Sequence, residues 1–183
     1  MKNIKNITFN EIKEFFDKLN EEDIKTVEQE INNAKKIFFA ARGCSNYPLQ
    51  HFCGRLGHLG FDVNMVGDTV TRPMAKGDLL ICASGSGTTK SILCLAEKAK
   101  SLGARVLLLT LSPQSAIGDL SDNIIVLPAY AYGGKSNQVE SIQLLGTLYE
   151  QALMIFCSIV VTSILYDNNI DKEYVAHNHT NLE

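Results

Sequence analysis

The chain of 183 residues is long enough for one domain with a sizeable core, and its composition, 45% hydrophobic and 20% charged, is typical of a soluble globular protein. Its formal net charge of −3 and the lack of a long basic segment argue against a nucleic-acid partner. The N-terminal segment has charges in every apolar stretch, unlike a signal peptide, and the uncharged run from Gln151 to Tyr166 is shorter than a membrane span. We therefore expect a cytoplasmic protein that does not bind membranes.

Five cysteines occur without the C-x-x-C spacing of redox or zinc motifs. This pattern favours reduced thiols in a cytosolic protein. We expect four of them, Cys53, Cys82, Cys94 and Cys157, to lie in or near the core.

The first 34 residues read as two helices, since their apolar residues follow the helical period. Thr8 and Glu11 have the spacing of a capping box for the first helix, and Asn20 is placed to cap the second. Strand and helix patterns then alternate. The expected strands cover residues 36–41, 62–66, 78–83, 105–110 and 123–127; the expected helices cover 47–59, 88–102, 138–167 and 171–176, with a short one after Pro113.

This alternation indicates a parallel sheet covered by helices on both faces, and the nearly continuous apolar strands agree with burial on both sides. We predict a three-layer α/β/α domain with a five-stranded parallel sheet. One domain spans residues 1–183, with N-terminal helices in 1–34, the α/β core in 35–167 and a C-terminal tail in 168–183. The long apolar helix over 138–167 makes association into homo-oligomers an expectation.

A loop rich in hydroxyl groups, Ser84-Gly85-Ser86-Gly87-Thr88-Thr89, follows the third expected strand. Its four hydroxyls, its glycines and the start of the next helix can together bind a phosphate. The spacing is neither that of a Walker loop nor G-x-G-x-x-G, so nucleotide binding is not expected. The plainer interpretation is a strand-to-helix turn capped by one hydroxyl, but a cap does not need four.

Four stretches carry a resemblance to a known family. They are the loop Ser84–Thr89, the region from Leu56-Gly57-His58-Leu59-Gly60-Phe61 to Gly77-Asp78-Leu79-Leu80-Ile81, the stretch from Leu145 to Phe156, and the terminus His179-Thr180-Asn181-Leu182-Glu183. The loop resembles the phosphosugar loop of SIS (sugar isomerase) domains. The last two stretches narrow the resemblance to the 6-phospho-3-hexuloisomerase family.

The resemblance implies a tetramer that interconverts a 3-ketohexose 6-phosphate and fructose 6-phosphate through an enediol, without a metal or a cofactor. Glu150 and His179 would transfer the protons, and His179 would reach the site of a neighbouring subunit. His177 is the alternative to His179, whereas His51 and His58 are expected to be structural. The phosphate-binding residues by position are Ser45, Ser84, Ser86, Thr88 and Thr89.

The loop after the first strand departs from the family pattern. The family usually has Gly-Arg-Ser-Gly where this chain has Gly43-Cys44-Ser45-Asn46, so an arginine and a glycine are missing. Gly43, Cys44 and Asn46 remain candidates for substrate contact, and Arg42 or Arg72 are candidates to supply the lost charge. The sugar phosphate that binds here can therefore differ from the family's substrate.

Two other functions are compatible with the same phosphate site. One is a binding module that senses a sugar phosphate without converting it, as in regulators that contain SIS domains. The other is a lyase or deglycase acting on an amino-sugar phosphate. Retention of both Glu150 and His179 favours the isomerase.

Overall fold

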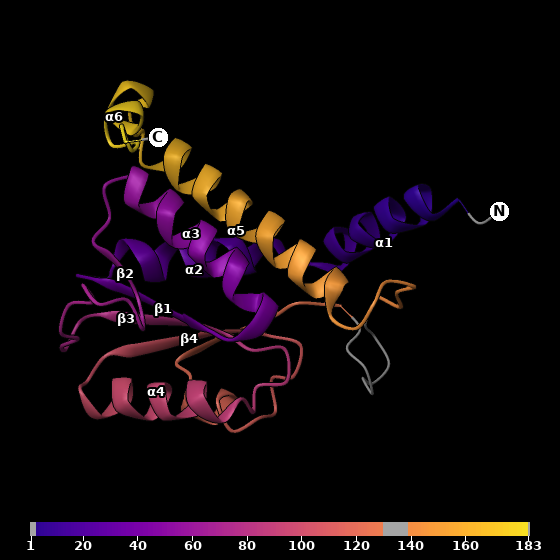
Figure 1. Ribbon diagram of the computed structural model, residues 1–183, viewed down its shortest axis with the longest axis horizontal. Helices are drawn as coiled ribbons and strands as arrows, with labels where there is room; N and C mark the ends of the chain where they lie inside the picture. Colours follow the sequence, from indigo (N-terminus) through magenta and orange to yellow (C-terminus); the bar gives the residue numbers. More distant parts are fainter. Residues whose placement is uncertain (1–2, 130–138, 183) are drawn as a thin grey trace.

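The computed structural model describes residues 3–129 and 139–182. Two helices, α1 (Ile4–Lys18) and α2 (Glu21–Asn32), precede alternating strands and helices (Figure 1). These are β1 (Ile37–Ala41), α3 (Asn46–His58), β2 (Val63–Met65), β3 (Leu79–Ala83), α4 (Lys90–Ser101), β4 (Arg105–Thr110), β5 (Asn123–Val126), α5 (Thr147–Asp167) and α6 (Lys172–His177). Short 3₁₀ turns cover Gly43–Ser45 and Gly118–Leu120, the latter in place of the helix expected after Pro113.

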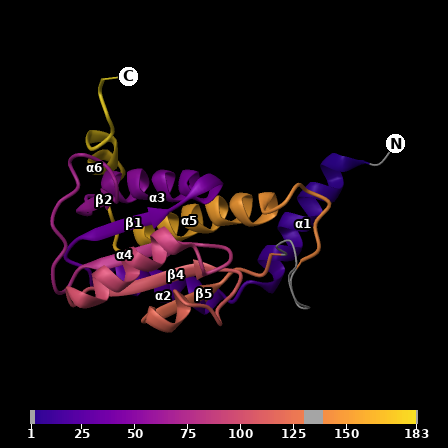
Figure 2. The same ribbon diagram turned by 60° about the horizontal axis from the view of Figure 1, so that its bottom comes forward.

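The five strands form one parallel sheet in the order β2-β1-β3-β4-β5. Helices α2, α3 and α5 cover one face, and α4 covers the other (Figures 1 and 2). The predicted three-layer α/β/α fold, its five-stranded parallel sheet and its N-terminal helices are confirmed.

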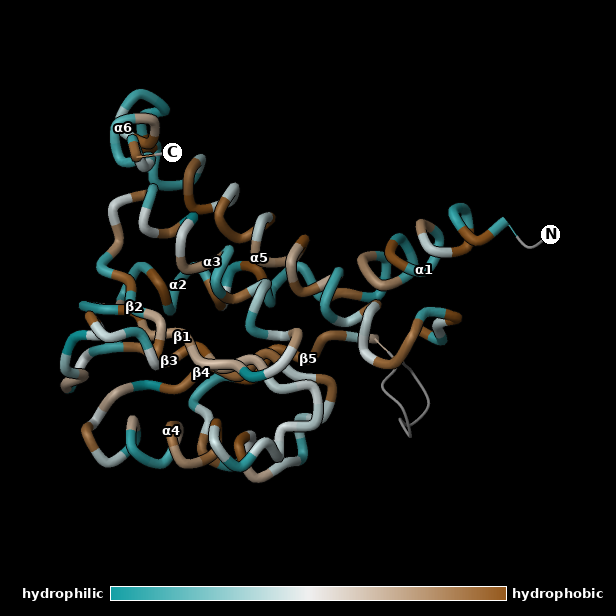
Figure 3. The backbone as a smooth tube through the Cα atoms, viewed as in Figure 1, coloured by the Kyte–Doolittle hydropathy of each residue, from teal (hydrophilic) through white to brown (hydrophobic). Residues whose placement is uncertain are grey.

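Side chains that alternate along each strand divide the core into two layers. In β1, Phe39 packs toward α3 and α5, whereas Phe38 packs toward α4. The backbone coloured by hydropathy shows the same concentration of apolar residues in the central strands (Figure 3). Burial on both faces explains why these strands read as unbroken apolar runs.

The start of α5 lies further along the chain than the sequence predicts. The expected helix over 138–167 begins at Thr147; residue 138 lies outside the described residues, and residues 139–146 are not helical. The carboxylate of Glu11 on α1 accepts the backbone N–H of Ile142 at 2.9 Å, and Leu145 has a φ of 49°. A tertiary contact therefore replaces the local helical hydrogen bonds in this segment.

Two smaller expectations also need correction. Helix α1 begins before Thr8 and is capped by Asn3, so Thr8 and Glu11 do not form a capping box. Asn20 does cap α2, accepting the backbone N–H of Glu22 at 3.2 Å. Cys94 is exposed, because it lies on the outer side of α4, while the other three cysteines expected in the core are buried and all five thiols are free.

Helix α5 is long and apolar enough to cross a membrane by length and composition alone. In this fold it packs on α2 and α3 over the sheet, and 44% of its most apolar 18-residue window is buried within the chain. Ile155 lies on its outer side with 37% of its surface exposed. The helix thus combines a core face with an apolar face that the single chain leaves uncovered.

Candidate functional site

Two polar loops meet at the carboxyl edge of the sheet, where parallel α/β folds bind ligands. Strands β1 and β3 are neighbours, and Ala41 pairs with Ala83 at their last position. The segments that follow, 43–46 and 84–89, therefore start side by side. The structure brings together the two loops that the sequence singles out.

The hydroxyls of the second loop face one another in two pairs. The Oγ of Ser84 and the Oγ1 of Thr89 are 3.0 Å apart, and Ser86 Oγ accepts from both the backbone N–H (3.3 Å) and the hydroxyl (3.1 Å) of Thr88. Ser84 is buried and Thr89 half-buried, whereas Ser86 and Thr88 are exposed. The loop therefore offers hydroxyls from its base to its rim.

Helix α4 begins immediately after this loop without a side-chain cap. Thr89 occupies the N-cap position but makes no capping hydrogen bond with its side chain. The first N–H groups of a helix need an acceptor, and they carry the positive end of its dipole. The loop is therefore not a strand-to-helix turn capped by one hydroxyl. The free N–H groups at the start of α4 suit an anion instead.

Buried contacts hold the loop from below. The hydroxyl of Thr110, fully buried at the end of β4, donates to the carbonyl oxygen of Ser84 at 2.7 Å. Gly87 has a φ of 64°, and a Cβ at this position would lie 2.0 Å from Ser115 Oγ. Only glycine fits that backbone conformation and that spacing. Thr110 was not identified from the sequence, where it reads as one more strand residue.

The first loop forms a 3₁₀ turn over Gly43–Ser45 and leads directly into α3 at Asn46. Cys44 is exposed, and Ser45 is half-buried. The guanidinium of Arg42, at the start of this loop, donates to the carbonyl oxygen of Ala41 at 3.0 Å. A cation therefore remains at the edge of the site, one position before the turn.

Arg72 does not reach this site. Its guanidinium lies 2.6 Å from the carboxylate of Asp62, which precedes β2. This ion pair places Arg72 at the amino end of the sheet, opposite the two loops. Within one chain the structure therefore does not bring Arg72 to the two loops, and Arg42 is the arginine that lies at the carboxyl edge.

Glu150 lies in the first turn of α5, beside the first loop. It lines a mainly apolar hollow of about 550 Å³ together with Ile12, Cys44, Tyr47, Pro48, Gln151, Met154 and Ile155. Partial burial raises the pKa of the Glu150 carboxyl above its usual value. A carboxylate that holds its proton more tightly is a stronger base, as proton abstraction from carbon requires.

The neighbouring residues fix α5 against the loops. The buried hydroxyl of Tyr149 donates to the carbonyl oxygen of Leu109 at 3.1 Å, and burial raises the pKa of this phenol. The side-chain oxygen of Gln151 is buried without a hydrogen-bond partner among the described residues. Such an acceptor is costly unless water, a ligand or another chain supplies a donor.

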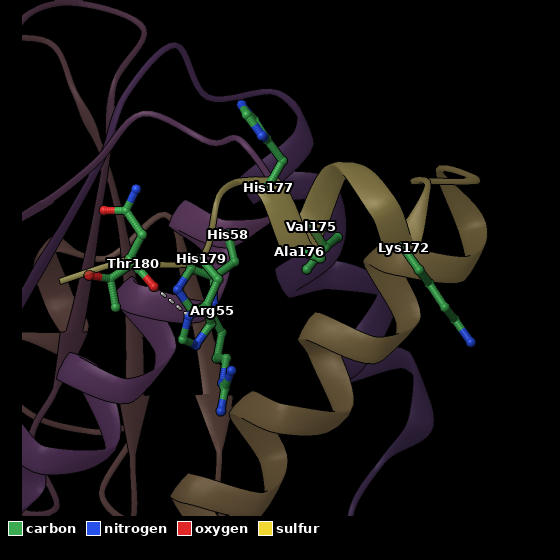
Figure 4. A pocket seen from close by; sticks show the side chains of 9 residues that line it. Arg55, His58, Lys172, Val175, Ala176, His177, His179 and Thr180 are labelled. Carbon is green, nitrogen blue, oxygen red and sulfur yellow. Dashed lines mark hydrogen bonds between the residues drawn. The ribbon is translucent and has the colours of Figure 1, made fainter. Parts of the chain in front are cut away.

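His179 lies at the other end of the molecule. It contacts the last turn of α3, where its ring centroid is 4.9 Å from that of His58 (Figure 4). Tyr47, at the first turn of α3, lines the Glu150 hollow. Tyr47 and His58 are eleven positions apart along the helix, a rise of about 16 Å. The structure does not bring Glu150 and His179 together within one chain.

Among the described residues, no group of three or more His, Cys, Asp or Glu side chains is arranged to hold a metal ion. The polar groups at the carboxyl edge are instead hydroxyls, backbone N–H groups, one arginine and one carboxylate. This set suits a phosphorylated, hydroxyl-rich molecule.

The fold and the loop define a class of protein. Residues 30–155 match the model of the SIS domain family, and the chain belongs to this family. The match covers β1 to the first half of α5 and so includes both loops and Glu150.

More specific similarity extends to nearly the whole chain. A 3-hexulose-6-phosphate isomerase from Bacillus subtilis (strain 168) is 37% identical over 90% of this chain and 89% of its own length. One from Mycobacterium gastri is 34% identical over 91% of this chain and 83% of its own length. The crystal structure of a Methanococcus jannaschii protein, for which a 3-hexulose-6-phosphate isomerase function was inferred, superposes with a TM-score of 0.83 and 32% identity, covering 97% of this chain and 98% of that one.

Proposed function

We propose that this protein is a phosphosugar isomerase that interconverts a 3-ketohexose 6-phosphate and fructose 6-phosphate. The observation that carries the proposal is that the start of α5 packs on the uncapped hydroxyl loop, since a Cβ on Gly85 would lie 3.8 Å from the ring of Tyr149. The next residue, Glu150, has a carboxyl whose pKa is raised by burial. The similarity to isomerases of this class over nine-tenths of the chain supports the substrate. The five free thiols agree with a cytoplasmic location.

The phosphate is bound by the second loop and the start of α4. Ser84, Ser86, Thr88 and Thr89 donate hydroxyls to its oxygens, and Ser45 donates from the first loop. The N–H groups and dipole of α4 favour the charge of the phosphate. Arg42 and Asn46, together with the exposed Cys44 and Gly43, line the side of the site where the sugar extends.

Glu150 then acts as the base. Its carboxylate removes the proton from C2 of the 3-ketose, and the electrons of that C–H bond form a C2–C3 double bond while the C3 oxygen takes up a proton. The resulting cis-enediol loses the proton of its C2 oxygen and receives at C3 the proton held by Glu150, which yields the 2-ketose and regenerates the carboxylate. His179 moves the proton between the two oxygens, since an imidazole exchanges protons near neutral pH.

This chemistry needs Glu150 and His179 within reach of one substrate. In the single chain they lie at opposite ends of α3, and the tail that bears His179 is held against that helix. We therefore place His179 in the site of a partner subunit within a homo-oligomer. The uncovered apolar residues near Glu150, including Ile155, and the unpartnered oxygen of Gln151 support an intersubunit position for this hollow.

The proposal is tested by proton exchange in heavy water, followed by NMR with fructose 6-phosphate and a panel of hexose and pentose phosphates. A 3-ketose isomerase exchanges the proton on C3 of fructose 6-phosphate, whereas an aldose–ketose isomerase exchanges one on C1. We expect C3 exchange that is lost in Glu150→Gln and kept in Glu97→Gln, a substitution on the exposed side of α4. Binding of sugar phosphates without exchange at any carbon would instead identify a sensor.

A further inference from the structure

A polar hollow lies where α6 folds back on the last turn of α3. Its volume is about 680 Å³, and its lining includes Arg55, His58, Lys172, His177 and His179. Figure 4 shows the side chains of His58 and His179 together, while those of Lys172 and His177 point away. The His58 and His179 rings have centroids 4.9 Å apart and planes inclined by 38°.

His58 also holds the tail through its backbone. The side-chain amide of Asn178 donates to the carbonyl oxygen of His58 at 3.2 Å. This carbonyl belongs to the last turn of α3, where carbonyl groups have no partner within the helix. Nearby, Tyr174 of α6 packs so closely on Gly60 that a Cβ there would lie 2.3 Å from its hydroxyl oxygen. The residue before His179 is thus anchored at a fixed point.

The hydrogen bond of the His179 ring indicates which of its two nitrogens can accept a proton. Nδ1 lies 3.0 Å from the carbonyl oxygen of Thr180, and a carbonyl oxygen can only accept. Nδ1 therefore carries a proton, and in the neutral ring Nε2 is the nitrogen that can take one up. A proton shuttle is more effective when a second group fixes the tautomer and the ring plane of the histidine.

We propose that His58 is a positioning residue for His179. Its ring packs against the imidazole of His179 and sets the plane in which Nε2 is presented to the partner's site, while its carbonyl oxygen anchors Asn178. This inference rests on the proposed function and adds to it a role for a histidine that the sequence suggested was structural.

A pair of substitutions tests the ring contact by kinetics. His58→Ala removes the ring and keeps the carbonyl, so kcat falls by about 10- to 100-fold while KM stays unchanged, because the phosphate loops lie elsewhere. His58→Phe keeps an aromatic ring and restores kcat to within a few-fold of the original. Lys172→Gln, in the same hollow but pointing away, leaves both constants unchanged. An unaltered kcat in His58→Ala, or a loss in His58→Phe equal to that in His58→Ala, overturns the proposal.

A second measurement does not depend on activity. The chain has four histidines, so selective ¹³C labelling of histidine Cε1 gives four signals. The signal of His179, assigned with His179→Gln, should shift and sharpen toward that of a mobile ring in His58→Ala but not in His58→Phe. An unchanged His179 signal in His58→Ala refutes the positioning role. If no sugar phosphate is converted by the original protein, the proposed function fails, and this spectrum still decides whether His58 orders His179.

Discussion

The catalytic role proposed for Glu150 has a consequence for stability. Its carboxyl is neutralised more readily in the folded protein than in the unfolded chain, because burial raises its pKa above 4.5. A raised folded pKa contributes stability that is complete below the unfolded pKa and is lost as the pH rises through the folded pKa. At neutral pH, therefore, the ionised carboxylate does not stabilise the fold.

We accordingly expect opposite effects of Glu150→Gln on activity and on stability. The substitution should lower kcat by about 10²- to 10⁴-fold, the contribution of general acid–base catalysis. It should leave the melting temperature at pH 7 equal or higher, because the amide carries no charge to bury. Scanning calorimetry checks this, and a clearly lower melting temperature at pH 7 would contradict the assigned environment. When kcat is measured against pH, its fall at low pH should give an apparent pKa higher than that of an ordinary glutamate.

The shape of the hydroxyl loop Ser84–Thr89 depends on Gly87. Its positive φ and its closeness to Ser115 mean that Gly87→Ala should destabilise the fold by about 1–3 kcal/mol and raise KM for the sugar phosphate. Gly54→Ala is the matched control, since Gly54 lies within α3 with open space around its Cβ position, and alanine there should stabilise by about 0.5–1 kcal/mol. Urea unfolding measures the stability of both variants. Equal stability of the two would show that Gly87 is not required for the close contact with Ser115.

Some residue positions could be predicted from the sequence and others could not. The hydroxyl loop was predictable because its residue types act locally, next to the helix whose start they share. The placement of Arg72 was not, because its partner Asp62 is set by the path of the chain around β2. The exposure of Cys94 was missed for a related reason, since one apolar-looking residue on α4 does not reveal which side it faces.

Among the elements, α1 and the segment before α5 depend on each other. The buried carboxylate of Glu11 accepts hydrogen bonds from the hydroxyl of Ser141 (2.7 Å), the N–H of Ile142 (2.9 Å) and the side-chain amide of Gln143 (3.0 Å). Desolvation by burial raises the pKa of this carboxyl, but the three hydrogen bonds outweigh it, and the net pKa is lowered. Glu11 thereby sets where α5 and its Glu150 begin, which local periodicity cannot show.

Glu11→Gln should therefore weaken the fold in a pH-dependent way. We expect a loss of about 1–3 kcal/mol at pH 7, because charged acceptors make stronger hydrogen bonds than amides. A lowered folded pKa contributes stability that is present above the unfolded pKa and lost as the pH falls through the folded value, so the difference should shrink below pH 4.5. Glu14→Gln, which breaks an exposed pair with Lys18 on the same helix, should change little. If Glu11→Gln lowered the free energy of unfolding by the same amount at pH 7 and below pH 4.5, the lowered pKa of Glu11 would be contradicted.

On the scale of the whole molecule, the alternation of strands and helices was sufficient to predict the parallel sheet and its two helical layers. It did not predict that the two proton-transfer candidates lie at opposite ends of α3, since the relative placement of α5 and α6 depends on tertiary packing. Helix α1 projects from the α/β body (Figures 1 and 2), with Phe9 65% exposed, and Leu182 near the chain end is 95% exposed. These apolar surfaces agree with a molecule that is completed by other copies of itself.

In the proposed homo-oligomer, one active site takes Glu150 from one subunit and His179 from another. Glu150→Gln and His179→Ala, each inactive alone, should regain activity when they are unfolded together and refolded as a mixture. In a random mixture, about a quarter of the sites combine an intact Glu150 with an intact His179 from the partner, so activity should return to about that fraction. A mixture as inactive as its two components would show that both residues must come from the same chain.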